Sequence, residues 1–423
     1  MFFILRRWLE FSPETRCALR VDVSVTLLFT VFTGLTSPFT GLILRRDLGA
    51  TPLQLSVLGS AGAACLLLSV AVARLIDCRR PLPWVVWPGF LARALFLLAP
   101  AISSPWPLVG VLVAGTALGT VMSPAQAALV QRVYPSAERG RALGTVRTAG
   151  ALVGIALAVL AGQILGRLSW RWVFPVAGLV GMASSLRQRH LPVSTDAAGG
   201  DARPALAEAW YAVRDDRAYR RLLISAFVFG SGVWLMQPAT PLLLADVVHA
   251  STGQVGVLAA AAALASIGGN LVWGRLVDGQ RSLKALRAVY TVGTCVPLIF
   301  ALCAVHPSLV IGASVAESLM ATGLDLVWML AVIEFAGPGR TAQYAAIAST
   351  LAGVRGVLGP LAGAALIETA GLQTLYAVAA TLMATGALLV WRQARHQNTP
   401  RYIEQPRQTS GGLSVMRAAR NAS

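Results

Sequence analysis

Twelve apolar blocks of about 20 residues, separated by polar or Pro/Gly-rich stretches, restrict the fold of this chain more than any other feature. This is the length that a helix needs to cross the hydrocarbon core of a membrane. The blocks cover residues 22–44, 53–75, 83–102, 107–132, 142–165, 170–187, 222–245, 254–276, 284–305, 308–335, 342–367 and 372–391. The composition agrees, because 56% of the 423 residues are hydrophobic and only 13% are charged. The sequence therefore predicts an all-α membrane protein with twelve transmembrane helices, and it excludes a soluble enzyme or a nucleic-acid-binding module.

The basic residues predict the orientation of these helices. Of the 35 Lys and Arg residues, 28 fall in segments that share one side with both termini, four fall in the opposite loops, and Arg93, Arg147 and Arg355 lie within spans. Cytoplasmic segments of membrane proteins are rich in basic residues, so we expect a multi-pass protein of the inner or plasma membrane with both termini in the cytoplasm. The net charge of +17 then requires no partner beyond lipid headgroups. The single lysine, Lys284, indicates GC-rich coding and favours a bacterial source.

An internal repeat divides the chain into two halves. The segment Arg74–Asp77 recurs as Arg275–Asp278 at an offset of 201 residues, and Arg139 recurs as Arg340 at the same offset. Gln54 and Gln254 match at an offset of 200. The expected division is a cytoplasmic N-terminal segment (1–21), an N-terminal six-helix half (22–187), a cytoplasmic linker (188–221), a C-terminal six-helix half (222–391) and a disordered cytoplasmic tail (392–423).

Two loops carry a family resemblance. Residues 274–281 read Gly-Arg-Leu-Val-Asp-Gly-Gln-Arg, and residues 73–80 read Ala-Arg-Leu-Ile-Asp-Cys-Arg-Arg. Both resemble the signature Gly-x-Leu-x-Asp-Arg-x-Gly-Arg-Arg between the second and third spans of the major facilitator superfamily, although the first copy is degenerate. Residues 134–144 are similar to the family's connection before span five, and residues 169–174 to its entry into span six. The resemblance implies two pseudo-symmetric six-helix bundles that transport a solute by alternating access.

The resemblance also implies a cytoplasmic latch. Asp77 would hold the start of span eleven, near Arg139 or Arg132, and Asp278 would act in the same way near span five. The alternative is that these charges only anchor helices at the membrane surface. The expected gating residues are Asp77, Arg79, Arg80, Arg139, Gly274, Asp278, Arg281 and Arg340. Two family markers are missing, namely the arginine of span four linked to proton coupling and the Gly-Pro signature that antiporters carry in span five.

Polar residues on the spans that the resemblance places along the pathway predict a cavity. Hydroxyl side chains follow one helical face of span one and of span four. They are Thr26, Thr30, Thr33, Ser37 and Thr40 in span one, and Thr116, Thr120 and Ser123 in span four. Span seven adds Ser231, Trp234, Gln237 and the helix breaker Pro238. The alternative reading is that small hydroxyl residues simply allow helices to pack closely in lipid.

Charges inside the spans are costly in lipid, so each is a functional candidate. Asp325 and Arg355 are expected at similar depth near the midplane and are predicted to form an ion pair, as a clamp or a protonation-controlled switch. Glu317 could bind a cationic group or carry a proton, because a desolvated carboxylate suits proton uptake and release. A static charge pair between helices is the alternative. Arg147 either reaches the cytoplasmic surface or binds an anionic substrate, and Arg93 has no assigned role.

These features favour a secondary transporter that moves a small organic solute and is coupled to protons, acting as a monomer without cofactor or metal. The five cysteines show no zinc or disulfide spacing. The expected substrate and coupling residues are Thr30, Thr33, Ser37, Thr120, Ser123, Trp234, Gln237, Glu317, Asp325 and Arg355. Sugars, amino-acid-like compounds and amphipathic drugs all fit this set. The alternatives are an efflux antiporter, a membrane-embedded transferase, and a transporter-like receptor or lipid-handling protein.

Overall fold

The computed structural model describes residues 11–75, 81–192, 213–214, 216–279, 282–336 and 340–396, and helices make up its regular structure. These are α2 (Pro13–Arg46), α3 (Pro52–Leu75), α4 (Pro81–Ala94) with the 3₁₀ segment η1 (Leu95–Ala101), α5 (Pro105–Val133), α6 (Ser136–Arg167), α7 (Trp170–Gln188), α9 (Arg217–Leu235), α10 (Ala239–Leu242) with the π-helical turn η2 (Leu243–Val247), α11 (Thr252–Gly279), α12 (Ser282–Leu302), the short η3 (Pro307–Leu309), α13 (Val310–Ala336) and α14 (Thr341–His396). The last of these bends at Gly371, where φ is 84°, so it contains two of the predicted spans. Each of the twelve predicted apolar blocks is therefore helical, the third and the seventh in more than one segment.

Local sequence explains where several helices begin. Ser12 caps α2 by accepting a hydrogen bond from the Thr15 N–H, and Pro13 occupies the first turn, where a missing N–H costs nothing. Asp216 caps α9 by accepting from the N–H groups of Ala218 and Tyr219. Because buried or lipid-covered helix ends need such partners, these residues fix the helix starts.

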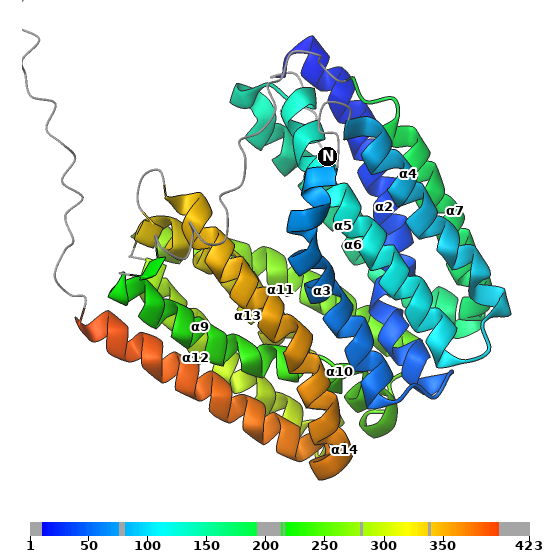
Figure 1. Cartoon of the computed structure of the whole chain (residues 1–423). Helices are drawn as coiled ribbons and strands as arrows, with labels where there is room; N and C mark the ends of the chain where they lie inside the picture. The colour runs from blue at the N-terminus through cyan, green and yellow to red at the C-terminus, as the bar shows by residue number, and fades with distance from the viewer. Residues whose placement is uncertain are drawn as a thin grey trace, which may run out of the picture.

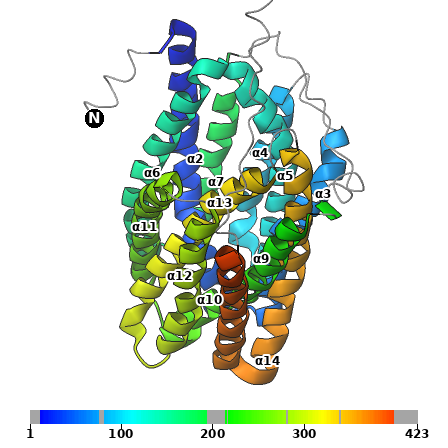
Figure 2. The ribbon, with the colours of Figure 1, turned by 90° about the vertical axis from the view of Figure 1, so that its left-hand side faces the viewer.

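The helices form two bundles, which we call the N-terminal half (α2 to α7) and the C-terminal half (α9 to α14). In the N-terminal half α2 packs on α6 and α7, while α4 packs on α5 and α7. In the C-terminal half α14 packs on α9 and α12, and α13 packs on α11 and α12. Aromatic side chains fill the centre of the second bundle, where the rings of Phe229 and Tyr290 stack at 3.9 Å. Figure 2 shows the helices running side by side between the two ends of the molecule.

The two halves meet toward one end and lean apart toward the other (Figure 1). We call the end where α2 begins and α14 finishes the inner end, following the predicted orientation, and the opposite end the outer end. Contacts between the halves run along α3 with α14 and along α6 with α11. The ribbons of the two halves therefore lie closer together at the outer end than at the inner end (Figure 1).

The sequence repeat has a structural counterpart at the outer corners. Thr51 and Gln54 exchange side-chain hydrogen bonds with each other's N–H groups at the start of α3, and Ser251 and Gln254 do the same at the start of α11. Just before each corner one residue has a positive φ, namely Gly49 at 69° and His249 at 51°. Gln54 and Gln254, which match at an offset of 200, therefore belong to the capping boxes of two equivalent helices.

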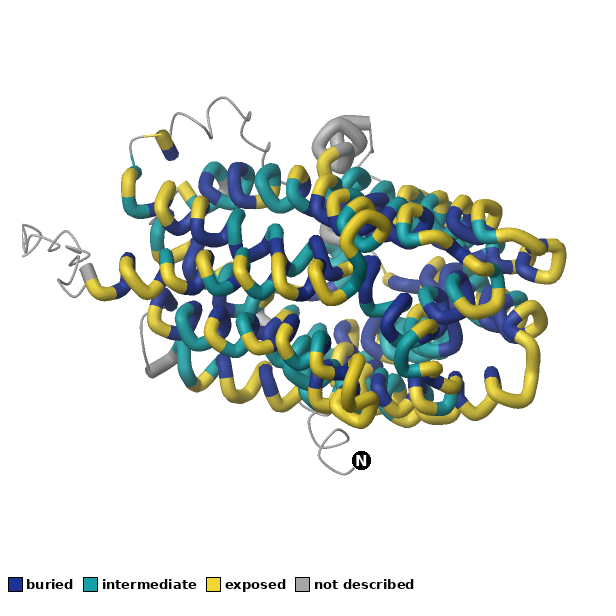
Figure 3. The backbone as a smooth tube through the Cα atoms, turned by 90° about the horizontal axis from the view of Figure 1, so that it is seen from below, coloured by how far each residue is buried: buried dark blue, intermediate teal, exposed yellow. Residues whose placement is uncertain are grey.

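The molecule presents a lipid-compatible surface. Among the described residues, nine helical stretches are long and apolar enough to cross a membrane, and the last of them, Gln343–Arg395, holds both helices of α14. Buried and exposed positions alternate along the helices (Figure 3), and many exposed side chains are leucines, such as Leu160, Leu271 and Leu388. A large exposed apolar surface of this kind is what lipid covers.

Candidate functional site

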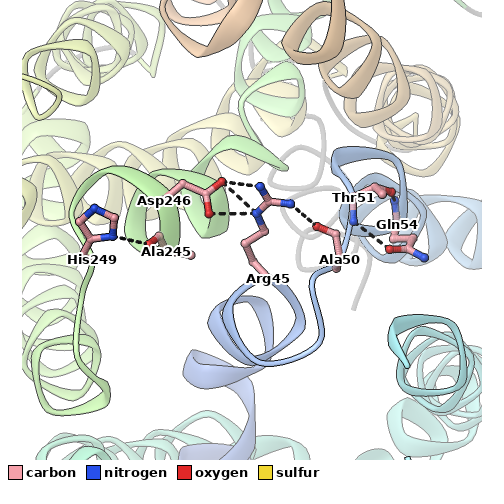
Figure 4. Close-up of polar contacts among 7 residues, drawn as sticks. All are labelled: Arg45, Ala50, Thr51, Gln54, Ala245, Asp246 and His249. Atoms are coloured by element: carbon pink, nitrogen blue, oxygen red, sulfur yellow. Dashed lines mark hydrogen bonds and ion pairs between the residues drawn. The ribbon is translucent and has the colours of Figure 1, made fainter. Parts of the chain in front are cut away.

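An ion pair joins the two halves at the outer end. Arg45, at the end of α2, donates from Nε to both carboxylate oxygens of Asp246 in η2 at 3.0 and 2.9 Å, and its Nη2 lies 2.7 Å from Oδ2. The Nη1 of Arg45 also donates to the Ala50 carbonyl at 2.8 Å (Figure 4). Such forked contacts fix the angle between the guanidinium and the carboxylate. The pair therefore holds the end of α2 against the end of the seventh span.

The position of this pair follows from the repeat. Arg45 and Asp246 are 201 residues apart, within one residue of corresponding positions in the two halves. A contact between corresponding positions lies at or beside the two-fold axis that relates two equivalent units. Nearby, an alanine at Gly41 would place its Cβ 2.7 Å from the Pro241 ring, so α2 and α10 touch there as well.

Small residues let the halves approach closely on both sides of this axis. On one side, an alanine Cβ at Gly256 of α11 would lie 2.5 Å from the Ala158 carbonyl oxygen of α6, and one at Gly162 would lie 2.7 Å from the Thr252 carbonyl oxygen. On the other side, Ser56 and Ser60 of α3 donate to carbonyls of α14 at 2.7 and 2.9 Å. Hydroxyl and glycine contacts of this type hold helices together in lipid.

A cavity of about 580 Å³ lies inside the N-terminal half, between α2, α4, α5 and α7. Its lining includes several of the predicted hydroxyl residues together with polar residues that the sequence does not assign to a cavity. The predicted ones are Thr26, Ser37, Thr40, Thr116 and Ser123, and the others are Asp22, Thr36, Arg93, Gln126, Ser184 and Gln188. The hydroxyl stripe therefore faces a cavity over part of its length.

Three predicted hydroxyl residues are placed differently. Thr30 packs against α6, where a Cβ at Gly154 would lie 3.5 Å from its methyl group. Thr33 donates to carbonyls of its own helix, and Thr120 donates to the Thr116 carbonyl. Of these three, Thr30 matches the close-packing alternative. The bonds of Thr33 and Thr120 do not separate the two readings, because Thr36 and Thr40 on the cavity wall make the same kind of bond. The role of all three in binding stays a prediction.

Arg93 is the charged residue at the centre of this cavity wall. Its side chain is 9% exposed, Nη1 donates to the Ser185 hydroxyl of α7, and its guanidinium carbon lies 4.9 Å from the centre of the Phe29 ring. Its Nε has no hydrogen-bond partner. The bare glycines Gly89 and Gly181 leave room for it, because a Cβ there would lie 2.5 and 2.8 Å from its side chain. Arg93 is therefore a buried cation without an anionic partner among the described residues.

The predicted ion pair between Asp325 and Arg355 is wrong for this conformation. Arg355 turns into the C-terminal half, donates to the Ala226 carbonyl of α9 and lies against Gly230. Asp325 is exposed and follows Gly323, which packs on α12, by two residues. Two residues turn a helix by about 200°, so Asp325 faces away from α12. Spacing along the chain predicts the depth of a residue in the membrane but not the rotation of each helix about its axis.

Arg147 and Asp325 lie instead at matching depth in opposite halves. Each is eleven residues from the inner end of its helix, about 16 Å along the axis, and each is exposed. Arg147 and Ala158 lie on the same face of α6. Arg147 is three helical turns closer to the inner end than Ala158, whose carbonyl oxygen lies near Gly256.

The remaining predicted residues occupy the C-terminal half. Trp234 packs against α14, where Cβ atoms at Gly356 and Gly359 would contact its ring and its Cβ. Gln237 is exposed and abuts Gly59 of α3. Glu317 is half-buried within electrostatic reach of Tyr376, whose buried hydroxyl has no hydrogen-bond partner, and none of the salt bridges found among the described residues involves it.

Comparison with known proteins decides the family. The family model described as Major Facilitator Superfamily matches residues 23–243 and, a second time, residues 222–422. The chain belongs to the major facilitator superfamily. Members of the superfamily are secondary transporters, so the membrane-enzyme hypothesis is wrong.

Solved superfamily structures share the fold. The nucleoside transporter NupG aligns with a TM-score of 0.65 at 11% identity, covering 90% of this chain and 100% of that chain. A bacterial homologue of the human lysosomal transporter Spinster, inward-facing and unoccupied, aligns with a TM-score of 0.57 at 14% identity, covering 91% and 96%. No curated protein matches the sequence. At these identities the likeness shows the fold alone.

Much of the superfamily gating signature lies outside the described residues. Asp77, Arg79, Arg80 and Arg281 are outside them, and the side chain of Asp278 is not described. Arg139 donates to the carbonyls of Gln131 and Tyr134, so it caps the end of α5. Arg340 lies over the Tyr344 ring at 5.7 Å, and Gly274 has open space around its Cα. The latch stays a prediction.

Two features of the contact between the halves are not predicted by the sequence. Arg45 is one of the four basic residues of the outer loops and Asp246 is not among the predicted site residues, although their separation of 201 residues equals the repeat offset. The glycines of the contact between α6 and α11 carry no pattern that separates them from other glycines in spans. Among the described residues no group of three or more His, Cys, Asp or Glu could hold a metal ion.

Proposed function

We propose that this transporter carries a small organic solute across the cytoplasmic membrane by alternating access, with its termini in the cytoplasm and the proton as coupling ion. The observation that carries the proposal is the asymmetry of the contacts between the halves. The ion pair of Arg45 and Asp246 and close glycine contacts join the halves at the outer end, while the ribbons of the halves lean apart toward the inner end (Figure 1), where Arg147 and Asp325 are exposed.

Alternating access requires two packings of the same halves that differ little in free energy. The contacts at the outer end combine the half-exposed ion pair, glycine and hydroxyl contacts with an apolar cluster that contains residues of both halves, among them Leu165 and Leu242. An ion pair with side chains 30% and 43% exposed contributes only about 0–1 kcal/mol. The ion pair therefore adds little to the cost of opening the outer end.

Transport by purified protein in liposomes tests this function. The panel should include sugars, amino acids, carboxylates and nucleosides, the last because NupG is a nucleoside transporter. We expect at least one class to accumulate faster than in empty liposomes when the pH gradient is imposed. A complete absence of flux and exchange for every class would contradict the proposal and favour a receptor or lipid-handling role.

Glu317 is the residue that we assign to proton coupling, because it is a half-buried carboxylate without a basic partner among the described residues. Replacing it with glutamine should reduce proton-driven accumulation at least about tenfold, since the amide cannot release a proton. Exchange of labelled for unlabelled solute, which needs no net proton movement, should continue. The matched control is Glu368→Gln, at an exposed position near the outer end of the same half. Equal accumulation by both variants would remove Glu317 from the coupling mechanism.

An efflux role for amphipathic compounds is the second candidate. It is favoured by the aromatic part of the cavity, where Phe29, Phe32 and Phe96 lie together and the last two rings meet edge-to-face at 5.0 Å. The direction of net transport in the liposome assay, measured with the gradient imposed in each sense, separates uptake from efflux.

A further inference from the structure

The cavity of the N-terminal half holds an unusual combination of charge and burial. Arg93 is the one cation among the described residues that line it, and Asp22 is the one carboxylate. Arg93 is nine-tenths buried and keeps its Nε without a partner. A buried charge whose counter-charge is missing is costly unless something supplies that counter-charge.

The Arg93 side chain is held in place rather than loosely packed. Gly89 and Gly181 leave the space that it fills, Ser185 takes one of its N–H groups, and the Phe29 ring covers its guanidinium face. A guanidinium has five N–H donors, so one hydrogen bond leaves most of them unused. Its fork geometry matches the two oxygens of a carboxylate.

Asp22 does not neutralise this charge. It lies seven residues before Phe29 on α2, about 10 Å toward the inner end, and its Oδ2 accepts a hydrogen bond from the Tyr134 hydroxyl at 2.7 Å. The cavity thus has an acidic group toward its inner end and a cationic group near its middle.

We propose that Arg93 binds the carboxylate of a small aromatic monoanion, which makes this cavity the substrate site of the transporter. The rings of Phe29, Phe32 and Phe96 next to Arg93 supply an apolar surface for the rest of the ligand. A monoanion fits better than a dianion, because a second charge would have no cation to meet. The volume lies within the range of about 300–1,000 Å³ of pockets that hold small organic ligands. The inference rests on the proposed transport function.

Three probes of nearly equal shape test the charge preference, namely benzoate, benzamide and benzylamine. Equilibrium binding of labelled benzoate to the purified full-length protein is measured, with the other two as competitors. We expect benzoate to bind and the neutral and cationic probes to compete at least about tenfold more weakly, because only the anion satisfies the guanidinium. The proposal is overturned if benzamide or benzylamine competes equally well, or if no benzoate binds at concentrations up to about 10 mM.

Variants locate the site. Arg93→Gln should raise the Kd of benzoate about 10- to 100-fold, Arg93→Lys should have an intermediate effect, and the control Arg171→Gln, at an exposed position of the outer end, should have none. Unchanged binding by Arg93→Gln would contradict the proposal.

A second readout leaves Arg93 intact, in case its replacement prevents folding. Ser123 lines the cavity and is exposed, so Ser123→Cys should react with a maleimide, as read by mass spectrometry of that peptide. Benzoate should slow this reaction at least about threefold and benzamide should not. Equal rates of maleimide reaction with and without benzoate would overturn the proposal that benzoate binds in this cavity. Because binding in detergent needs no transport, failure here is distinct from failure of the transport assay.

Discussion

Replacing Gly256 with alanine should shift the transporter away from the conformation that is closed at the outer end. The added Cβ would lie 2.5 Å from the Ala158 carbonyl oxygen of the other half, and a backbone atom cannot turn aside as a flexible side chain can. Overpacking of this kind costs about 1–3 kcal/mol. Because the strain exists only while α6 and α11 are in contact, the cost falls on the outer-closed conformation alone, and the conformational ratio should change about 5- to 150-fold.

The shift can be followed with a cysteine at Thr40, which is buried on the cavity wall near the outer end. A membrane-impermeant maleimide added from outside should react with the cysteine at position 40 about 5- to 100-fold faster when Gly256 is replaced with alanine than when Gly256 is kept. The control is Gly268→Ala on the same helix, where a Cβ meets no atom within 4 Å. Similar rates for both variants would show that the contact between α6 and α11 does not restrain the outer end.

Reversing one charge of the outer ion pair should open the same end, and reversing both should close it again. Arg45→Asp places two carboxylates where the forked contact now lies, and Asp246→Arg places two guanidinium groups there. The native pair is half-exposed and contributes at most about 1 kcal/mol, and replacing attraction with repulsion adds a similar amount. Each single variant should therefore increase labelling at position 40 about 5- to 30-fold.

The double variant Arg45→Asp/Asp246→Arg tests whether the two residues act through each other. Because they lie at nearly corresponding positions beside the two-fold axis, exchanging their charges leaves the geometry of the contact nearly unchanged. We expect labelling to return to within about twofold of the wild-type rate, and the single-variant effects to weaken at high salt. Additive effects in the double variant would show that the charges act separately.

The elements of the fold could be predicted because lipid imposes a simple rule. A chain that crosses the membrane must satisfy its backbone hydrogen bonds within each helix, so apolar length alone predicts each span. The family match and the solved structures confirm the superfamily fold expected from the loop at Gly274–Arg281. The repeat was detectable because Gln54 and Gln254 are capping-box residues that each half needs at the same corner.

The site could be predicted only in part, because apolar periodicity does not fix the rotation of a helix in lipid. Ser37 lines the cavity, Thr30 of the same stripe packs on α6, and Thr26 does both. Asp325 and Arg355 have the expected depth but face different directions. The surroundings of the Arg93 side chain could not be predicted, because they are formed by glycines of two helices and by Ser185, which is 92 residues away in the sequence.

Distances measured by spin labels at both ends of the molecule test alternating access most directly. One pair, Leu168→Cys and Val305→Cys, reports the outer end, and a second, Gly144→Cys and Met329→Cys, reports the inner end; all four positions are exposed. The exposed native residues Cys17 and Cys295 are first replaced with serine. Under an imposed pH change or with a transported solute, we predict that the outer distance lengthens while the inner distance shortens in the same population of molecules. Distances that stay fixed at both ends, or that lengthen together, would contradict the account.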